Sequence, residues 1–167
     1  APRKIISVAE VLDPQDAMTI SSVFRQRVHQ IYECTEGFLA STCDHGTLHL
    51  NEDLVYFERE FLDRERSRFV PIITDLYRRT QPHVRYRLDD VLVLRREPCP
   101  CGSVLTAIEA IEGRCDDILY FRRRGSADQV VAVYADFIRR AILLGSDQVV
   151  EYQAVQKSID DLAIGLK

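Results

Sequence analysis

The sequence predicts an α+β fold in which many short strands accompany two helices. Short apolar segments separated by turn residues run through most of the chain, and only two segments show apolar residues at helical spacing. Strands and helices do not alternate as they do in a series of βαβ units. The 167 residues are enough for a hydrophobic core.

The two helices are predicted from their start and stop signals. Asp13 followed by Pro14 is typical of a helix start, with an N-cap residue and a proline in the first turn. Apolar residues then recur at helical spacing, and we expect this helix to run to about Gln30. The second helix is expected at 135–144, with Gly145 as its C-terminal stop.

The strands are predicted from apolar runs and from alternation of apolar and polar residues. Residues 31–37 are interpreted as a connection, and 51–53 as a hairpin turn. The expected strands are 5–9, 38–41, 47–50, 54–62, 69–76, 84–87, 91–94, 105–111, 118–121, 149–155 and 162–166.

Composition excludes several classes of protein. The 22 basic and 26 acidic side chains give a net charge of −4, which does not favour nucleic acid or an anionic membrane as a partner. Five cysteines, an odd number without a secretion signal, indicate free thiols in a reducing cytoplasm. The chain opens with Ala1 and enters an apolar run almost at once, so we expect it to be part of a longer polypeptide.

A Cys-Pro-Cys-Gly segment is a candidate half of a metal site. Cys99 and Cys101 point to the same side of an extended backbone, which Pro100 favours, and Gly102 lets the chain turn away. Two sulfur atoms so placed could approach the separation of about 3.8 Å that a tetrahedral zinc site requires.

The remaining metal ligands have to come from elsewhere in the chain. Cys43 and His49 flank a turn and are the best candidates, while His45 competes with His49. The alternative interpretation is a small buried cysteine pair with no metal. Cys34 and Cys115 are interpreted as small core residues.

Charged residues at strand ends suggest a second site. The pairs Asp89–Asp90 and Asp116–Asp117 could accept hydrogen bonds from sugar hydroxyls, and Arg114 after Gly113 could contact a phosphate or a ribose. Glu36 could bind a magnesium ion held by phosphates. Together they suggest a nucleotide site, although each alone is also typical of a turn or an exposed ion pair.

Five motifs between Tyr32 and Leu119 resemble the adenylate-forming superfamily. They are Tyr-Glu-Cys-Thr-Glu-Gly, a Cys followed by Gly-x-Leu-His-x-x-Glu-Asp, Arg-Tyr-Arg-x-x-Asp, Cys-x-Cys-Gly and Gly-Arg-x-Asp-Asp-Ile-Leu. The most similar branch is the phenylacetate–coenzyme A ligase family, including its relatives that adenylate a deazaflavin coenzyme.

The resemblance implies both a fold and an activity. Residues 1–115 would be the strand-rich C-terminal part of the large adenylation domain, with a structural zinc, and 116–167 a small α+β C-terminal domain. The reaction would join a carboxylic acid to AMP from ATP, and a thiol such as coenzyme A would then accept the acyl group. The missing N-terminal part of the same polypeptide would be needed, so this chain alone is expected to be inactive.

The resemblance also implies roles for single residues. Thr35 would contact the AMP phosphate and Glu36 would bind Mg²⁺, and these two are the candidate catalytic residues. Tyr32 would lie beside the adenine, and Asp90 would hold the ribose hydroxyls.

Further implied roles concern the domain hinge and the zinc. Arg114 would lie near the ribose at the hinge, and Asp116 would mark the start of the small domain. The structural zinc would be held by Cys43, His49, Cys99 and Cys101.

The chain departs from the family pattern in four places, one of which is the replacement of the usual glycine-rich turn after Leu119 by Arg-Arg-Arg-Gly at 122–125. Leu88–Asp89 replaces the usual Thr-Gly or Thr-Arg before the ribose aspartate, and the phosphate loop would lie upstream of Ala1. Lys157 and Lys167 do not lie in the motif of the expected catalytic lysine. The alternative function is therefore a zinc-stabilised binding or scaffolding module without catalysis. Nucleic-acid binding through 122–124 and 139–140 is disfavoured, because no aromatic residue beyond Phe121 is interleaved with these arginines and the net charge is negative.

Overall fold

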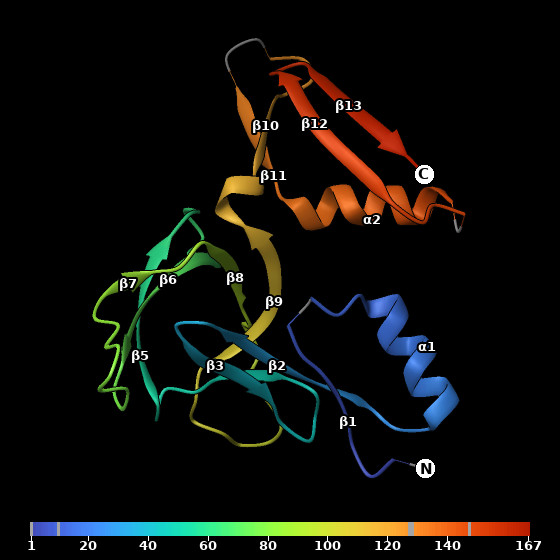
Figure 1. The fold of residues 1–167 in the computed structure, drawn as a ribbon. Coiled ribbons are helices and arrows are strands. Elements are labelled where there is room, and N and C mark those ends of the chain that lie inside the picture. The colour runs from blue at the N-terminus through green and yellow to red at the C-terminus, as the bar shows by residue number, and fades with distance from the viewer. Residues whose placement is uncertain (1, 10, 127–128, 147) are drawn as a thin grey trace. The chain divides into compact units, whose positions relative to one another are not determined.

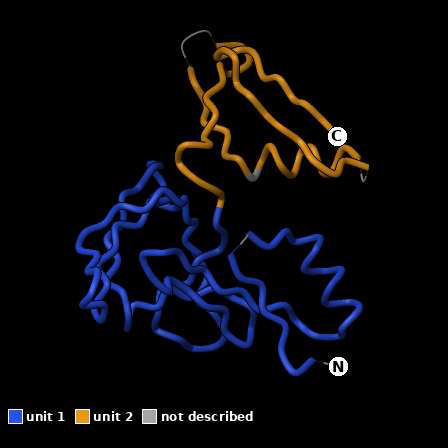
Figure 2. The backbone as a smooth tube through the Cα atoms, viewed as in Figure 1, with its two compact units in different colours: residues 1–111 blue, residues 112–167 orange. Residues whose placement is uncertain are grey.

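The chain forms two compact units in a computed structural model. The structure describes residues 2–9, 11–126, 129–146 and 148–167. Unit 1 is Ala1–Ile111 and unit 2 is Glu112–Lys167 (Figure 2). Among the described residues no helix has both the length and the apolar character that a membrane crossing requires.

Unit 1 is built around one nine-stranded sheet (Figure 1). Its elements are β1 (Ile5–Ser7), α1 (Pro14–Phe24), β2 (Val28–Cys34), β3 (Gly37–Thr42), β4 (Leu48–Leu50), β5 (Val55–Phe61), β6 (Arg68–Asp75), β7 (Tyr86–Arg87), β8 (Asp90–Leu94) and β9 (Ala107–Arg114). The strand order is β1-β2-β3-β4-β9-β8-β6-β5, and β7 pairs with β6. The α+β class predicted from the sequence is confirmed.

The core of unit 1 lies between strands that are distant in the sheet order. Strands β3 and β5 are in contact although four strands separate them in that order, so the sheet curls upon itself. Its centre is filled by large side chains that are fully shielded from solvent. They include Leu39, Leu50, Phe69, Ile73 and Leu92, each with 0 % relative exposure. These residues come from four strands, β3, β4, β6 and β8, which the core therefore holds together.

Unit 2 combines two small antiparallel sheets with one helix. Its elements are the 3₁₀ turn η1 (Cys115–Asp117), β10 (Leu119–Arg122), β11 (Val130–Val133), α2 (Ala135–Gly145), β12 (Tyr152–Ser158) and β13 (Asp161–Leu166). Strand β10 pairs with β11, and β12 pairs with β13. Gly113 has φ +100°, and a Cβ atom there would lie 3.3 Å from the Cβ of Ala135, so only glycine suits this position.

The first helix is shorter than the sequence pattern predicts. Asp13 caps α1 by accepting a hydrogen bond from the amide of Gln15, as expected. The helix ends at Phe24 rather than Gln30, because Arg25 adopts a left-handed conformation with φ 52°. The chain then enters β2, which pairs in parallel with β1, so the predicted connection at 31–37 is wrong for most of its length.

Three strand predictions also need correction. Residues 51–53 form a turn but not a hairpin, since β4 pairs with β3 and β9 while β5 pairs with β6. The strand expected at 84–87 is reduced to two residues because Arg85 has φ 48°. Strand β11 was not predicted at all.

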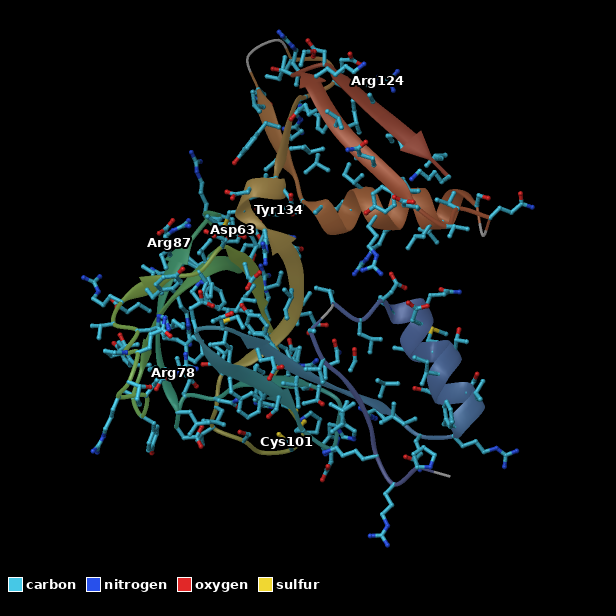
Figure 3. All side chains as sticks on the ribbon, in the orientation of Figure 1. Asp63, Arg78, Arg87, Cys101, Arg124 and Tyr134 are labelled. Carbon is cyan, nitrogen blue, oxygen red and sulfur yellow. The ribbon has the colours of Figure 1, made fainter. Side chains whose placement is uncertain are left out.

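The turn between β5 and β6 is closed by hydrogen bonds to one carboxylate. Between β5 and β6, the carboxylate of Asp63 (Figure 3) accepts hydrogen bonds from the Ser67 amide at 2.8 Å, the Ser67 hydroxyl at 2.5 Å and the Arg68 amide at 3.1 Å. Partial burial opposes ionisation, yet these donors lower the pKa of Asp63 below its usual value. The carboxylate therefore closes the turn in its ionised form.

Asp63→Ala should destabilise the protein by about 1–2 kcal/mol at neutral pH, because it leaves these donors without their acceptor. Since the folded pKa is depressed, the contribution is complete above the unfolded pKa of about 4 and is lost as pH falls through the lower folded value. Urea unfolding of wild type and variant at a series of pH values would measure this. Asp53→Ala, at an exposed turn carboxylate, is the matched control, and an equal loss in both variants would contradict the prediction.

Candidate metal centre and nucleotide site

The first half of the candidate metal centre is the turn between β3 and β4. The Cys43 amide donates to the Thr47 carbonyl at 2.9 Å, and the Gly46 amide donates to the Cys43 carbonyl at 2.8 Å. Gly46 has φ +80°, which closes this tight turn. His49 follows on β4, where it pairs with Ala107 of β9.

The second half is the Cys-Pro-Cys-Gly segment between β8 and β9. The Gly102 amide donates to the Cys99 carbonyl at 3.1 Å, and Gly102 has φ +73°, so the chain turns directly after Cys101 (Figure 3). The turn expected from this segment is therefore present. Because β9 lies beside β4 in the sheet, the pairing of these strands brings the two halves together.

The four side chains expected to hold a metal converge on one point. Their ligand atoms all lie within 4.8 Å of one another. The sulfur atoms of Cys43 and Cys99 are 3.7 Å apart, and the Cys101 sulfur lies 3.4 Å from Nε2 of His49. Tetrahedral zinc with sulfur and imidazole ligands requires about 3.8 Å and about 3.6 Å for these separations. The donor set and its spacing therefore fit zinc.

Neighbouring groups favour the protonation states in which these side chains can bind a metal. Nδ1 of His49 lies 3.0 Å from the Leu105 carbonyl, which favours a proton on Nδ1 and leaves Nε2 free to ligate. The Ser103 amide donates to the Cys101 sulfur at 3.4 Å. Hydrogen bonds from the Thr47 side chain and the Cys101 backbone lower the pKa of the Cys99 thiol to about 5, which favours the thiolate.

The structure also separates the competing candidates. His49 is buried and belongs to the cluster, whereas His45 lies in the exposed part of the turn, where its carbonyl accepts a hydrogen bond from Arg27. Cys34 and Cys115 do not belong to the cluster. The half-buried thiol of Cys34 instead lies near the Gly37 carbonyl, at 3.9 Å.

Thr35 and Glu36 form the two-residue connection between β2 and β3. Cys34 and Gly37 pair on either side of it, so both side chains are presented at the end of a hairpin. The Thr35 carbonyl accepts a hydrogen bond of 2.7 Å from Nη1 of Arg78 (Figure 3), a residue that follows β6. Nothing in the sequence around Arg78 indicated this contact.

The Glu36 carboxylate is held in its ionised form. Partial burial opposes ionisation, but hydrogen bonds with Cys34 and Tyr86 and the proximity of His83 lower the pKa of Glu36. Its negative charge and hydrogen bond in turn raise the pKa of Tyr86. Tyr86 lies in the Arg-Tyr-Arg motif, so two of the motifs singled out in the sequence meet here.

Tyr32 and Asp90 are joined by a short hydrogen bond. The Tyr32 hydroxyl donates to Oδ2 of Asp90 at 2.6 Å, and Tyr32 has a relative exposure of 8 % within the core. Burial, and then the Asp90 charge and hydrogen bond, raise the pKa of Tyr32 far above its ordinary value. The Tyr32 hydroxyl is therefore protonated at neutral pH and donates this hydrogen bond.

The departure from the family pattern before Asp90 also has a structural explanation. Leu88 is 4 % exposed and packs in the core, and its amide donates to the Pro71 carbonyl at 2.9 Å. The residue that replaces the family's threonine thus anchors the start of β8. Its neighbour Asp89 is exposed and lies 3.6 Å from Arg87.

The remaining candidates, Arg114 and Asp116, belong to unit 2, because β9 continues past the unit boundary between Ile111 and Glu112. Arg114 is the last residue of β9 and Asp116 lies in η1, and both are exposed. Their proposed roles at a hinge remain predictions.

Comparisons with known proteins identify the fold. No family model matches the chain, and no curated protein does either. Solved structures do match, and they include 2-hydroxyisobutyryl-CoA ligase, an adenylate-forming enzyme. The chain therefore has the fold of part of an adenylate-forming enzyme, which agrees with the superfamily expected from the motifs.

Two crystal structures of this ligase illustrate the likeness. The postadenylation state with R3-HIB-AMP matches with a TM-score of 0.70 at 22% identity, over 92% of this chain and 34% of the ligase chain. An open conformation with 2-HIB-AMP and CoA matches with a TM-score of 0.66 at 21% identity, over 96% of this chain and 36% of the ligase chain. This chain thus spans about a third of the length of the proteins that it matches.

Proposed function

We propose that this chain is the nucleotide-binding and zinc-binding part of an AMP-forming ligase that activates a carboxylic acid with ATP. One observation carries the proposal. On a fold like that of an adenylate-forming enzyme, Tyr32 links the strand leading into the Thr35–Glu36 connection directly to Asp90. This contact links the Thr35–Glu36 connection, proposed to bind a phosphate and a cation, to Asp90, which is proposed to bind a ribose. All three residues belong to unit 1.

The proposed chemistry follows from these side chains. The Thr35 hydroxyl would donate a hydrogen bond to a nucleotide phosphate, and the ionised Glu36 would supply an oxygen ligand for Mg²⁺. Bound there, Mg²⁺ would neutralise phosphate charge while the substrate carboxylate displaces pyrophosphate. Asp90 accepts hydrogen bonds from the ribose and orients the nucleotide.

The zinc proposed for Cys43, His49, Cys99 and Cys101 has a structural role. Four protein ligands fill a tetrahedral zinc, so no position remains for a substrate. The metal ties the β3–β4 turn to the segment before β9. This ligand set supports assignment to the phenylacetate–coenzyme A ligase branch, which the five motifs between Tyr32 and Leu119 together resemble.

Further parts of the proposal rest on the relatives. One matching ligase structure contains both an acyl-AMP and CoA, which supports coenzyme A as the acceptor here. We place the large-domain part at residues 1–115 and the small domain at 116–167, with the rest of the ligase in an N-terminal part of the same polypeptide. The free thiols are consistent with a cytoplasmic location.

ATP–pyrophosphate exchange by the complete polypeptide tests this proposal. We expect saturable ATP binding in calorimetry and exchange that depends on an added carboxylic acid, surveyed over a panel of aryl and alkyl acids. Stoichiometric zinc without binding of ATP or AMP would contradict the proposal and favour the non-catalytic zinc-stabilised module.

A further inference from the structure

The Tyr32–Asp90 hydrogen bond connects segments that the sheet itself does not pair. Strands β2 and β8 are separated by β3, β4 and β9 in the strand order, and the two residues are 58 positions apart in the chain. Only the curling of the sheet brings the phenol and the carboxylate together. The contact thus crosses the interior of unit 1 and ends on the residue proposed to bind ribose.

We propose that Tyr32 is a positioning residue that fixes the Asp90 carboxylate and so sets the preference of the site for a nucleotide with ribose hydroxyls. The inference rests on the proposed function and deepens it. It gives the Tyr32 hydroxyl a task separate from any contact of the ring with adenine.

The first support is the rigidity of the donor. Tyr32 packs in the hydrophobic core with Leu39, Phe57 and Leu92, so its ring has little freedom to turn. Its hydroxyl is a neutral donor to an ionisable acceptor at 2.6 Å, the short distance typical of a charge-assisted hydrogen bond. The phenol therefore defines one position for Oδ2 of Asp90.

The second observation that supports the inference concerns the two carboxylate oxygens of Asp90. Asp90 is followed directly by fully buried Val91, and Leu88 two residues before it is also buried, so mainly the Asp90 side-chain torsions are left to be fixed. Oδ2 is occupied by Tyr32, and within the described part of the chain no hydrogen bond reaches Oδ1. Asp90 is half-buried, so Oδ1 is the atom left to accept a hydroxyl from a ligand.

A pre-oriented carboxylate binds a ribose hydroxyl more tightly because less freedom is lost on binding. Removing the Tyr32 hydroxyl should weaken only ligands that use Asp90. We expect Tyr32→Phe to lower the affinity for AMP about tenfold, within the range measured for hydrogen bonds to charged groups. The affinity for 2′,3′-dideoxyAMP, which has no hydroxyl to offer, should change less than about twofold.

Calorimetry with AMP and 2′,3′-dideoxyAMP on the complete polypeptide tests the inference. The wild type should prefer AMP, and Tyr32→Phe should lose most of that preference, whereas a merely structural role would weaken both ligands equally. Tyr56→Phe is the control, because Tyr56 is exposed and has no hydrogen bond described for its hydroxyl. Equal weakening of both ligands, or an unchanged preference, would overturn the inference.

Two results separate this inference from the proposed function. A wild type that binds no AMP, or does not distinguish the two ligands, overturns the nucleotide site and the inference with it. A wild type with a preference that survives in Tyr32→Phe overturns the inference alone. If Tyr32→Phe does not fold, a crystal structure of the wild type with AMP decides: Tyr32 must still hold Oδ2 while Oδ1 accepts the ribose hydroxyl.

Discussion

Replacing Cys99 with serine should prevent binding of the proposed zinc and lower the free energy of unfolding by about 3–5 kcal/mol, because binding of a structural metal contributes directly to folding and loss of a metal is among the most destabilising changes. The reason is the position of this residue. Cys99 is only 9 % exposed, and its sulfur lies 3.7 Å from that of Cys43, at the junction of two segments 56 residues apart. A serine hydroxyl is a much poorer zinc ligand than a thiolate, so only three of the four tetrahedral positions would keep a protein ligand.

Zinc content by elemental analysis and thermal unfolding should change together. For a domain of the size of unit 1 (Ala1–Ile111), a loss of about 3 kcal/mol lowers the melting temperature by on the order of 10–20 °C. Cys34→Ser is the matched control, because it removes a half-buried thiol of the same unit outside the cluster. Wild-type protein that is stable without metal, or a Cys99→Ser variant that keeps its zinc, would refute the structural role.

The four candidate metal ligands show which parts of the site could be predicted from the sequence. Local rules predicted the geometry of Cys99 and Cys101, since Pro100 and Gly102 limit the backbone around them. They favoured His49 but left His45 as a competitor, and the motif resemblance then indicated His49. The structural reason for this choice is the pairing of β4 with β9, a contact between segments far apart in the chain that local rules do not reveal.

In the secondary structure, too, some features follow from local sequence signals and others depend on contacts between distant segments. Asp13, Pro14 and the apolar face predicted the start of α1, but its end at Phe24 depends on a left-handed arginine, a residue with no particular preference for that conformation. The sequence of β2 was assigned partly to the helix and partly to a connection. Its strand conformation comes from pairing with β1 and β3, and such pairing outweighs local propensity.

The proposed nucleotide site depends even more on tertiary structure. Motif resemblance suggested Tyr32, Glu36 and Asp90 one by one, but not that the Tyr32 hydroxyl contacts Asp90. It also gave no sign of Arg78, which holds the Thr35 carbonyl. These contacts arise from the curvature of the sheet and from the loop after β6, and both are set by packing across the core.

Asp90→Ala should reduce the affinity of the complete polypeptide for AMP by about 10- to 100-fold, since hydrogen bonds to a charged acceptor contribute about 1.5–3 kcal/mol. The variant removes the proposed ribose acceptor and leaves the Tyr32 hydroxyl without its partner. It should also abolish most of the discrimination between AMP and 2′,3′-dideoxyAMP. Calorimetric titration with both ligands measures the two effects at once.

Asp89→Ala provides the matched control for this change. It removes a carboxylate of equal charge one residue away, but Asp89 is exposed and its partner is Arg87 at 3.6 Å rather than a buried phenol. An exposed ion pair of this kind contributes little to stability or binding. Because both variants change the net charge equally, a loss of AMP affinity confined to Asp90→Ala would isolate the contribution of the fixed carboxylate. Equal losses in the two variants would instead point to a general electrostatic effect and contradict the assignment of Asp90 to ribose.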